Sequence, residues 1–119
     1  MSVRLLDMDN IAKAGLVILF DTAIQQIESA VTFAKVLRAH LPVIRRSETF
    51  SDMADDIASI ARTIDDISTT LRAMITGTYM QLSELTGEDA VYVKESIDNT
   101  LGQLKDMIDG AKPYLFGTE

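Results

Sequence analysis

Cysteine is absent from this sequence of 119 residues, and so is tryptophan. Without cysteine the chain can form no disulfide, no thiolate nucleophile and no thiolate metal ligand. One histidine, His40, leaves no second imidazole for a nucleophile–base pair. The six glycines are scattered, and none belongs to a phosphate-binding GxxxxGK loop. The sequence therefore predicts no catalytic residue, no cofactor and no metal ligand of the common kinds.

Positive charge is also scarce. Lysine and arginine number 11 against 18 aspartates and glutamates, which gives a formal net charge of -7. An acidic surface repels the phosphates of nucleic acids and of anionic membranes. Only 6% of the residues are aromatic, so there is little material for stacking on bases. We therefore expect no direct nucleic-acid binding.

Proline occurs twice, and the pattern between the prolines is helical. Apolar residues recur at steps of three and four throughout, without the alternation typical of strands. We expect Pro42 to end the first helix and Pro113 to follow the last one. The prediction is one domain over residues 1–119, an all-α antiparallel bundle of three helices with heptad packing. The helices span about 3–41, 50–85 and 88–111, the first two are long, and a short tail covers 112–119.

Polar residues at fixed spacing predict where the second and third helices begin. Thr49 with Asp52 three residues later, or alternatively Ser51, fits the N-cap of the second helix. Thr86 with Asp89 repeats the pattern for the third. Gly77 is a weak point inside the second helix that would bend it or end it early.

The second and third helices carry continuous apolar seams. Beside the seam of the second helix runs a row of small residues that allows close helix approach, namely Ala54, Ala61 and Ser68. The seam itself consists of Phe50, Met53, Ile57, Ile60, Ile64, Ile67, Leu71 and Met74. The seam of the third helix consists of Ala90, Ile97, Leu101, Leu104, Ile108 and Ala111, and Lys94 occupies one core-type position.

The first helix carries unusually little charge. Between Gly15 and Leu37 only Asp21, Glu28 and Lys35 are charged, and they fall seven residues apart on one narrow strip. One apolar seam, from Val17 to Ala34, would suffice for packing within the chain. Four further apolar residues point away from that seam, where a monomer normally places charge: Ile18, Leu19, Phe33 and Val36.

This apolar segment is a poor candidate for a membrane span. The uninterrupted apolar run covers only residues 15–20. A spanning helix needs about 20 apolar residues, and each charge near its centre costs roughly 2.5 to 3.5 kcal/mol. We therefore expect the second apolar face to contact protein and predict no membrane span.

Helix lengths suggest where that contact lies. At 1.5 Å per residue the first two helices would each be roughly 50 Å long and the third about 36 Å. The third helix would then leave one end of the first two uncovered, and a two-helix hairpin cannot bury its apolar faces alone. We predict a homo-oligomer, with a dimer favoured, or a complex with another protein. The predicted interface residues are Leu19, Phe33, Val36, Leu37, Met53 and Ile57.

Two further segments are candidates for partner contact. Arg45 and Arg46 form a basic pair in a predicted loop of an otherwise acidic chain. Tyr114 and Phe116 in the tail could dock on a partner, although folding back onto the bundle is the favoured use. His40 suits the negative end of the first helix, where an imidazolium is stabilised.

These observations lead to three functional hypotheses. The first is a noncatalytic, self-associating bundle that serves as an interaction, scaffold or accessory module. The alternative is a magnesium-dependent nucleotide hydrolase that uses the carboxylates of the second and third helices: Asp52, Asp55, Asp56, Asp65, Asp66, Glu84, Glu88, Glu95 and Asp98. The second alternative is an acidic inhibitor that mimics nucleic acid. The expected location is the cytoplasm, with leaderless secretion as the alternative.

Overall fold

The structure is a computed structural model that describes the backbone of residues 2–116 and the side chains of residues 9–115. Three long helices, α1 (Ser2–Arg46), α2 (Ala54–Met80) and α3 (Gly87–Ala111), pack against one another. Short 3-10 turns, η1 (Ser51–Met53) and η2 (Leu82–Glu84), precede and follow α2, and α4 (Pro113–Phe116) ends the described chain. Residues 2–116 contain no strand. The predicted all-α bundle of three helices is therefore confirmed.

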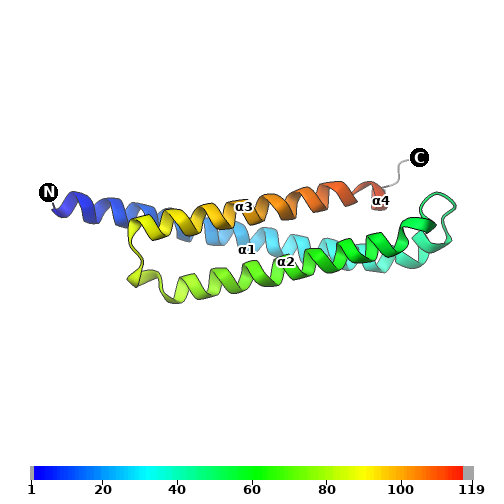
Figure 1. Cartoon of the computed structure of the whole chain (residues 1–119), viewed down its shortest axis with the longest axis horizontal. Coiled ribbons are helices and arrows are strands. Elements are labelled where there is room, and N and C mark those ends of the chain that lie inside the picture. Colours follow the sequence, from blue (N-terminus) through cyan, green and yellow to red (C-terminus); the bar gives the residue numbers. More distant parts are fainter. Residues whose placement is uncertain (1, 117–119) are drawn as a thin grey trace.

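The helices run up, down and up along one long axis. α2 returns antiparallel to α1, and α3 runs back in the direction of α1, so that the start of α1 and the end of α4 lie toward opposite ends of the bundle (Figure 1). The molecule measures 68 × 24 × 16 Å, which makes it a narrow rod. A rod of three helices leaves one side of each helix without an intramolecular neighbour. The composition of that outer side then decides whether the chain is stable in water as a monomer.

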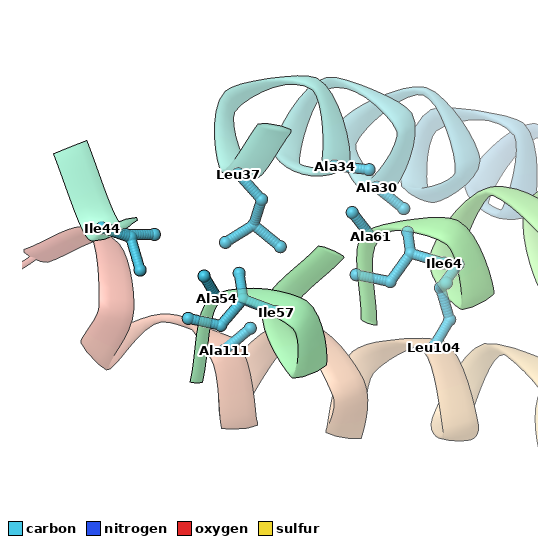
Figure 2. Packing of buried hydrophobic residues seen from close by; sticks show 10 residues of the cluster. All are labelled: Ala30, Ala34, Leu37, Ile44, Ala54, Ile57, Ala61, Ile64, Leu104 and Ala111. Atoms are coloured by element: carbon cyan, nitrogen blue, oxygen red, sulfur yellow. The ribbon is translucent and has the colours of Figure 1, made fainter. Parts of the chain in front are cut away.

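Two apolar clusters follow each other along the rod. The first lies toward the α1–α2 connection and contains Ala30, Ala34, Leu37, Ile44, Ala54, Ile57, Ala61, Ile64, Leu104 and Ala111 (Figure 2). The second lies toward the α2–α3 connection and contains Leu16, Phe20, Ala23, Ile27, Leu71, Ile75, Ala90, Ile97 and Leu101. Each long helix contributes to both clusters, so both clusters hold all three helices together.

Small residues form the centre of the buried stripe on α2. Ala54, Ala61 and Ser68 are buried together with Ile57, Ile64, Leu71 and Ile75. Ala30 and Ala34 of α1 face Ala61 in the same cluster, and the absence of longer side chains lets the two backbones approach (Figure 2). The expected row of small residues is thus part of the core. Of the predicted α2 seam, Ile60, Ile67 and Met74 are half-buried, and Met53 is exposed.

The first helix does not end at Pro42, as the sequence predicted. α1 continues to Arg46 with Pro42 inside it, so Val43 to Arg46 are helical and form no loop. Proline removes one backbone donor and usually interrupts a helix. Here Pro42 is exposed, and Ile44 in the following turn is buried with Ala54 and Leu37. Burial of Ile44, worth on the order of 1.5 to 3 kcal/mol, favours the additional turn.

The two predicted helix starts differ in outcome. Thr86 and Asp89 form a reciprocal capping box at the start of α3, as predicted. At the start of α2, however, Met53 is the N-cap, and no side chain caps it. Ser47 instead accepts hydrogen bonds from the backbone N–H groups of Thr49 and Phe50, each at 3.1 Å, and shapes the connection. α2 runs unbroken through Gly77 and ends at Met80, five residues before the predicted end.

The expectation that α3 leaves one end uncovered is wrong. α3 begins beside Asp9, whose carboxylate accepts a hydrogen bond from the Gly87 N–H. From there α3 reaches the far cluster, where Leu104 and Ala111 pack with Leu37 and Ile57. Because α2 is shorter than predicted, α3 matches it closely in length. Lys94 does not occupy a core position either, since it is exposed and pairs with Asp98 at 3.4 Å.

Candidate interaction surface

The six predicted interface residues fall into three groups. Leu37 and Ile57 are fully buried within the chain, so they have no surface to offer a second molecule. Leu19 and Phe33 are half-buried. Val36 and Met53 are exposed, at 38% and 37%. Leu37 and Ile57 were expected at an interface, but they are buried because α3 covers the end of the α1–α2 pair that was expected to be open.

The largest exposed apolar side chains of α1 lie on its outer side. Ile11 is 70% exposed, Ile18 68% and Val43 57%. Ile11 and Ile18 are seven residues apart, as are Val36 and Val43, so each pair lies along one line of the helix. Uncharged polar residues, all exposed, continue these lines between the two pairs. We call this surface the outer strip, and it consists of Ile11, Ile18, Thr22, Gln25, Ser29, Thr32, Val36 and Val43.

None of the eight residues of the outer strip is charged, and the nearest charges of α3 lie beside its middle, where Gln25 and Ser29 line a groove with Lys105, Asp109 and Lys112. The charged residues of the same segment, Asp21, Glu28 and Lys35, are exposed on a different line of α1. Asp21 lines a groove with Ile75 and Tyr79, which places its line on the side of α2. A solvated helix face normally carries charges, because they are the side chains that water stabilises best. The missing charge therefore marks the outer strip as a surface suited to contact.

A shallow groove adjoins the C-terminal half of the strip. It has a volume of about 430 Å³ and is lined by Ser29, Thr32, Phe33, Val36, His40 and Leu115. Ser29, Thr32, Phe33 and Val36 stand at positions i, i+3, i+4 and i+7, which is the arrangement that forms a hole for one side chain of a second helix. Leu115 from α4 forms one edge. His40 donates a hydrogen bond from Nδ1 to the Val36 carbonyl oxygen at 3.0 Å, which holds the imidazole at the other edge.

The remaining candidate residues are engaged within the chain or lie outside the described side chains. Arg45 and Arg46 form the last turn of α1, where positive charge is favourable, and Arg45 contacts Asp55 at 3.4 Å. Tyr114 packs edge to face against Phe50 with ring centroids 5.5 Å apart. Tyr114 and Leu115 contact the first core cluster, so this part of the tail folds back. The Phe116 side chain lies outside the described residues.

The carboxylates do not converge on a cation site in the part of the chain whose side chains are described. Among residues 9–115 no three aspartate, glutamate or histidine side chains are grouped closely enough to hold a metal ion. Asp65 is engaged by Arg38 at 2.7 Å, and Asp55 by Arg45. Asp98 pairs with Lys94 on the exposed side of α3. These aspartates act as surface charges in ion pairs, which gives the magnesium hypothesis no geometric support.

One helix of the described chain, over Asp9–Arg46, is long and apolar enough to cross a membrane when judged by length and composition alone. Only 28% of its most apolar 18-residue window is buried in the bundle. Core helices of soluble proteins meet the same criterion. The residues of α1 that face outward include the apolar members of the outer strip as well as many polar and charged residues.

Sequence reasoning missed Ile11 and Val43 because they lie outside the weakly charged segment from Gly15 to Leu37. The seven-residue steps from Ile11 to Ile18 and from Val36 to Val43 were the available signal. Other exposed apolar residues, Tyr79, Met80 and Tyr92, lie on α2 and α3.

Comparison with protein-family models, with curated proteins and with solved structures gives no match to this chain.

Proposed function

We propose that this protein is a noncatalytic bundle that associates with itself through α1 and serves as an interaction, scaffold or accessory module. The observation that carries the proposal is the outer strip, an exposed helix face about 50 Å long, from Ile11 to Val43, without a charged side chain. Burying a large apolar side chain contributes on the order of 1.5 to 3 kcal/mol before the costs of association. In such a dimer, burial of Ile11, Ile18, Val36 and Val43 of both copies supplies the favourable free energy of association.

The expected strength follows from the size of the strip. Two strips about 50 Å long and about 10 Å wide, placed face to face, would remove roughly 1,000 Å² of surface from water in total. That area lies at the lower end for specific protein complexes. The proposed dimer is therefore reversible, and its population rises with protein concentration.

Sedimentation velocity and light scattering over a micromolar concentration series test the proposal. The wild-type chain, with a mass of 13.1 kDa, is expected to approach twice that mass as concentration rises. Ile18→Glu places a charge on the strip and should shift the protein to a monomer. Gln103→Glu makes the same change in charge at an exposed position of α3 and should leave the dimer intact. A wild-type monomer throughout the series would refute the proposal.

A further inference from the structure

We infer that the second copy binds antiparallel to the first, with Ile18 of each chain seated in the groove beside Val36 of the other. This inference rests on the proposed self-association and specifies its geometry. The occupant of the groove is thus a defined side chain of an identical chain. The two-fold axis of such a dimer crosses α1 between Gln25 and Ser29.

The order of side chains along the outer strip is symmetric about that axis. Ile11 and Val43 lie equally far from residue 27, and so do Ile18 and Val36. The uncharged polar residues between them are symmetric as well, because Thr22 mirrors Thr32 and Gln25 mirrors Ser29. An antiparallel pair therefore places Ile11 opposite Val43 and Ile18 opposite Val36, and it places the uncharged polar residues between them opposite one another. A two-fold interface of this kind requires a self-complementary surface.

Shape distinguishes the antiparallel pair from a parallel one. Ile18 protrudes, with 68% of its surface exposed, whereas the groove near Val36 is a hollow of about 430 Å³. A parallel pair would bring Ile18 against Ile18 and one hollow against the other. An antiparallel pair brings each Ile18 to the level of Val36 of the neighbouring chain, where the groove extends from Val36 to His40.

The helix dipoles favour the same orientation. An antiparallel pair places the positive end of one α1 beside the negative end of the other, whereas a parallel pair places like ends together.

Cysteine cross-linking tests the arrangement directly, because the chain has no cysteine of its own. Single Ile18→Cys and Val36→Cys variants are treated with a short bismaleimide, separately and after mixing. The antiparallel dimer predicts a covalent product only in the mixture, since residues 18 of the two copies would be about 27 Å apart along the helix axis. Thr69→Cys, on an exposed position of α2, is the control and should give no product.

The outcomes separate this inference from the proposed function. A dimer in sedimentation that cross-links within the separate Ile18→Cys or Val36→Cys samples overturns the antiparallel arrangement and leaves self-association standing. A monomer at all micromolar concentrations overturns both. Flotation of the wild-type chain with phosphatidylcholine vesicles, without dimer formation, would assign the outer strip to a lipid surface and also overturn both. Circular dichroism establishes that each variant is folded.

Discussion

Asp9 and Gly87, which are 78 positions apart in the chain, are joined by a hydrogen bond of 3.0 Å from the Gly87 backbone N–H to Oδ1 of Asp9. Gly87 is the first residue of α3, and its N–H has no acceptor within that helix. A carboxylate at this position also lies near the positive end of the helix dipole. The contact fixes the point along α1 at which α3 begins, and hence how far α3 reaches toward the opposite tip.

Replacing Asp9 should therefore destabilise the bundle. We expect Asp9→Ala to lower the free energy of unfolding by about 1 kcal/mol, because it removes an acceptor from the start of α3. Asp9→Asn keeps an acceptor oxygen and should lower the free energy of unfolding by a smaller amount. Urea unfolding followed by circular dichroism measures both variants. Equal stability of Asp9→Ala and the wild type would show that the contact does not help to hold α3.

Gly87→Ala should destabilise the protein more than the addition of one methyl group usually does. A Cβ at residue 87 would overlap the Asp9 carboxylate and lie 3.3 Å from the Asp9 Cα. We expect a loss of about 1 to 3 kcal/mol in unfolding free energy, typical of overpacked positions. In an Asp9→Ala background the carboxylate is gone, so the penalty for Gly87→Ala should be smaller. Strictly additive losses in this double-mutant cycle would contradict the close approach.

At Gly77 we expect a glycine-to-alanine substitution to have the opposite effect and to stabilise the protein. Gly77 lies inside α2, it is exposed, and apart from its chain neighbours and the adjacent helix backbone no described atom lies within 4 Å of the position a Cβ would take. Gly77→Ala should raise the free energy of unfolding by up to about 1 kcal/mol, because alanine has less backbone entropy to lose in a helix. Gly102→Ala on α3 meets the same conditions and serves as the matched comparison. Thermal unfolding of both variants shows whether each is more or less stable than the wild type.

Features of the fold that depend on neighbours in sequence could be predicted, and those that depend on distant residues could not. The Thr86–Asp89 capping box joins residues three positions apart, and the buried positions of α3 follow the helical period. The end of α1, in contrast, depends on burial of Ile44 against Ala54. The reach of α3 depends on Asp9, far away in the chain. Neither contact is encoded in a local pattern.

The candidate surface was predictable in part for the same reason. The missing charge on α1 is a local property, and it correctly drew attention to Ile18 and Val36, both of which are exposed. Leu37 and Ile57 were placed on the surface because α3 was expected to stop short of them. Once α3 covers that end, the most exposed apolar residues of α1 lie on its outer strip, while Val17, which is 37% exposed, lies beside Asp21 on the side of α2.

Ser68 is a polar residue in the core whose replacement should stabilise the protein. It is 2% exposed, and its hydroxyl finds no hydrogen-bond partner among the described residues. Leaving a buried hydroxyl unpaired costs about 1 to 3 kcal/mol. Ser68→Ala should therefore raise the free energy of unfolding by about 1 kcal/mol in urea titration. Ser68→Val tests the space available, and overpacking there should reverse the gain.

Arg38 and Asp65 link α1 to α2 through an ion pair of 2.7 Å on the surface, with side chains 41% and 36% exposed. Exposed pairs contribute little, so a double-mutant cycle with Arg38→Ala and Asp65→Ala should give a coupling energy of about 0.2 to 1 kcal/mol. The coupling should shrink as salt is added, because ions screen exposed charges. A coupling unaffected by molar salt would contradict a solvent-exposed pair.

The arrangement of the core as two clusters in series has a consequence for how the molecule opens. Loosening of either tip disrupts only the cluster nearest to it, while the other retains its packing. Backbone amides near the junction, around Ile27, Leu71 and Leu104, should therefore exchange with deuterated solvent last, and protection should fade toward both tips. The bundle would then unfold locally from its two ends toward the middle.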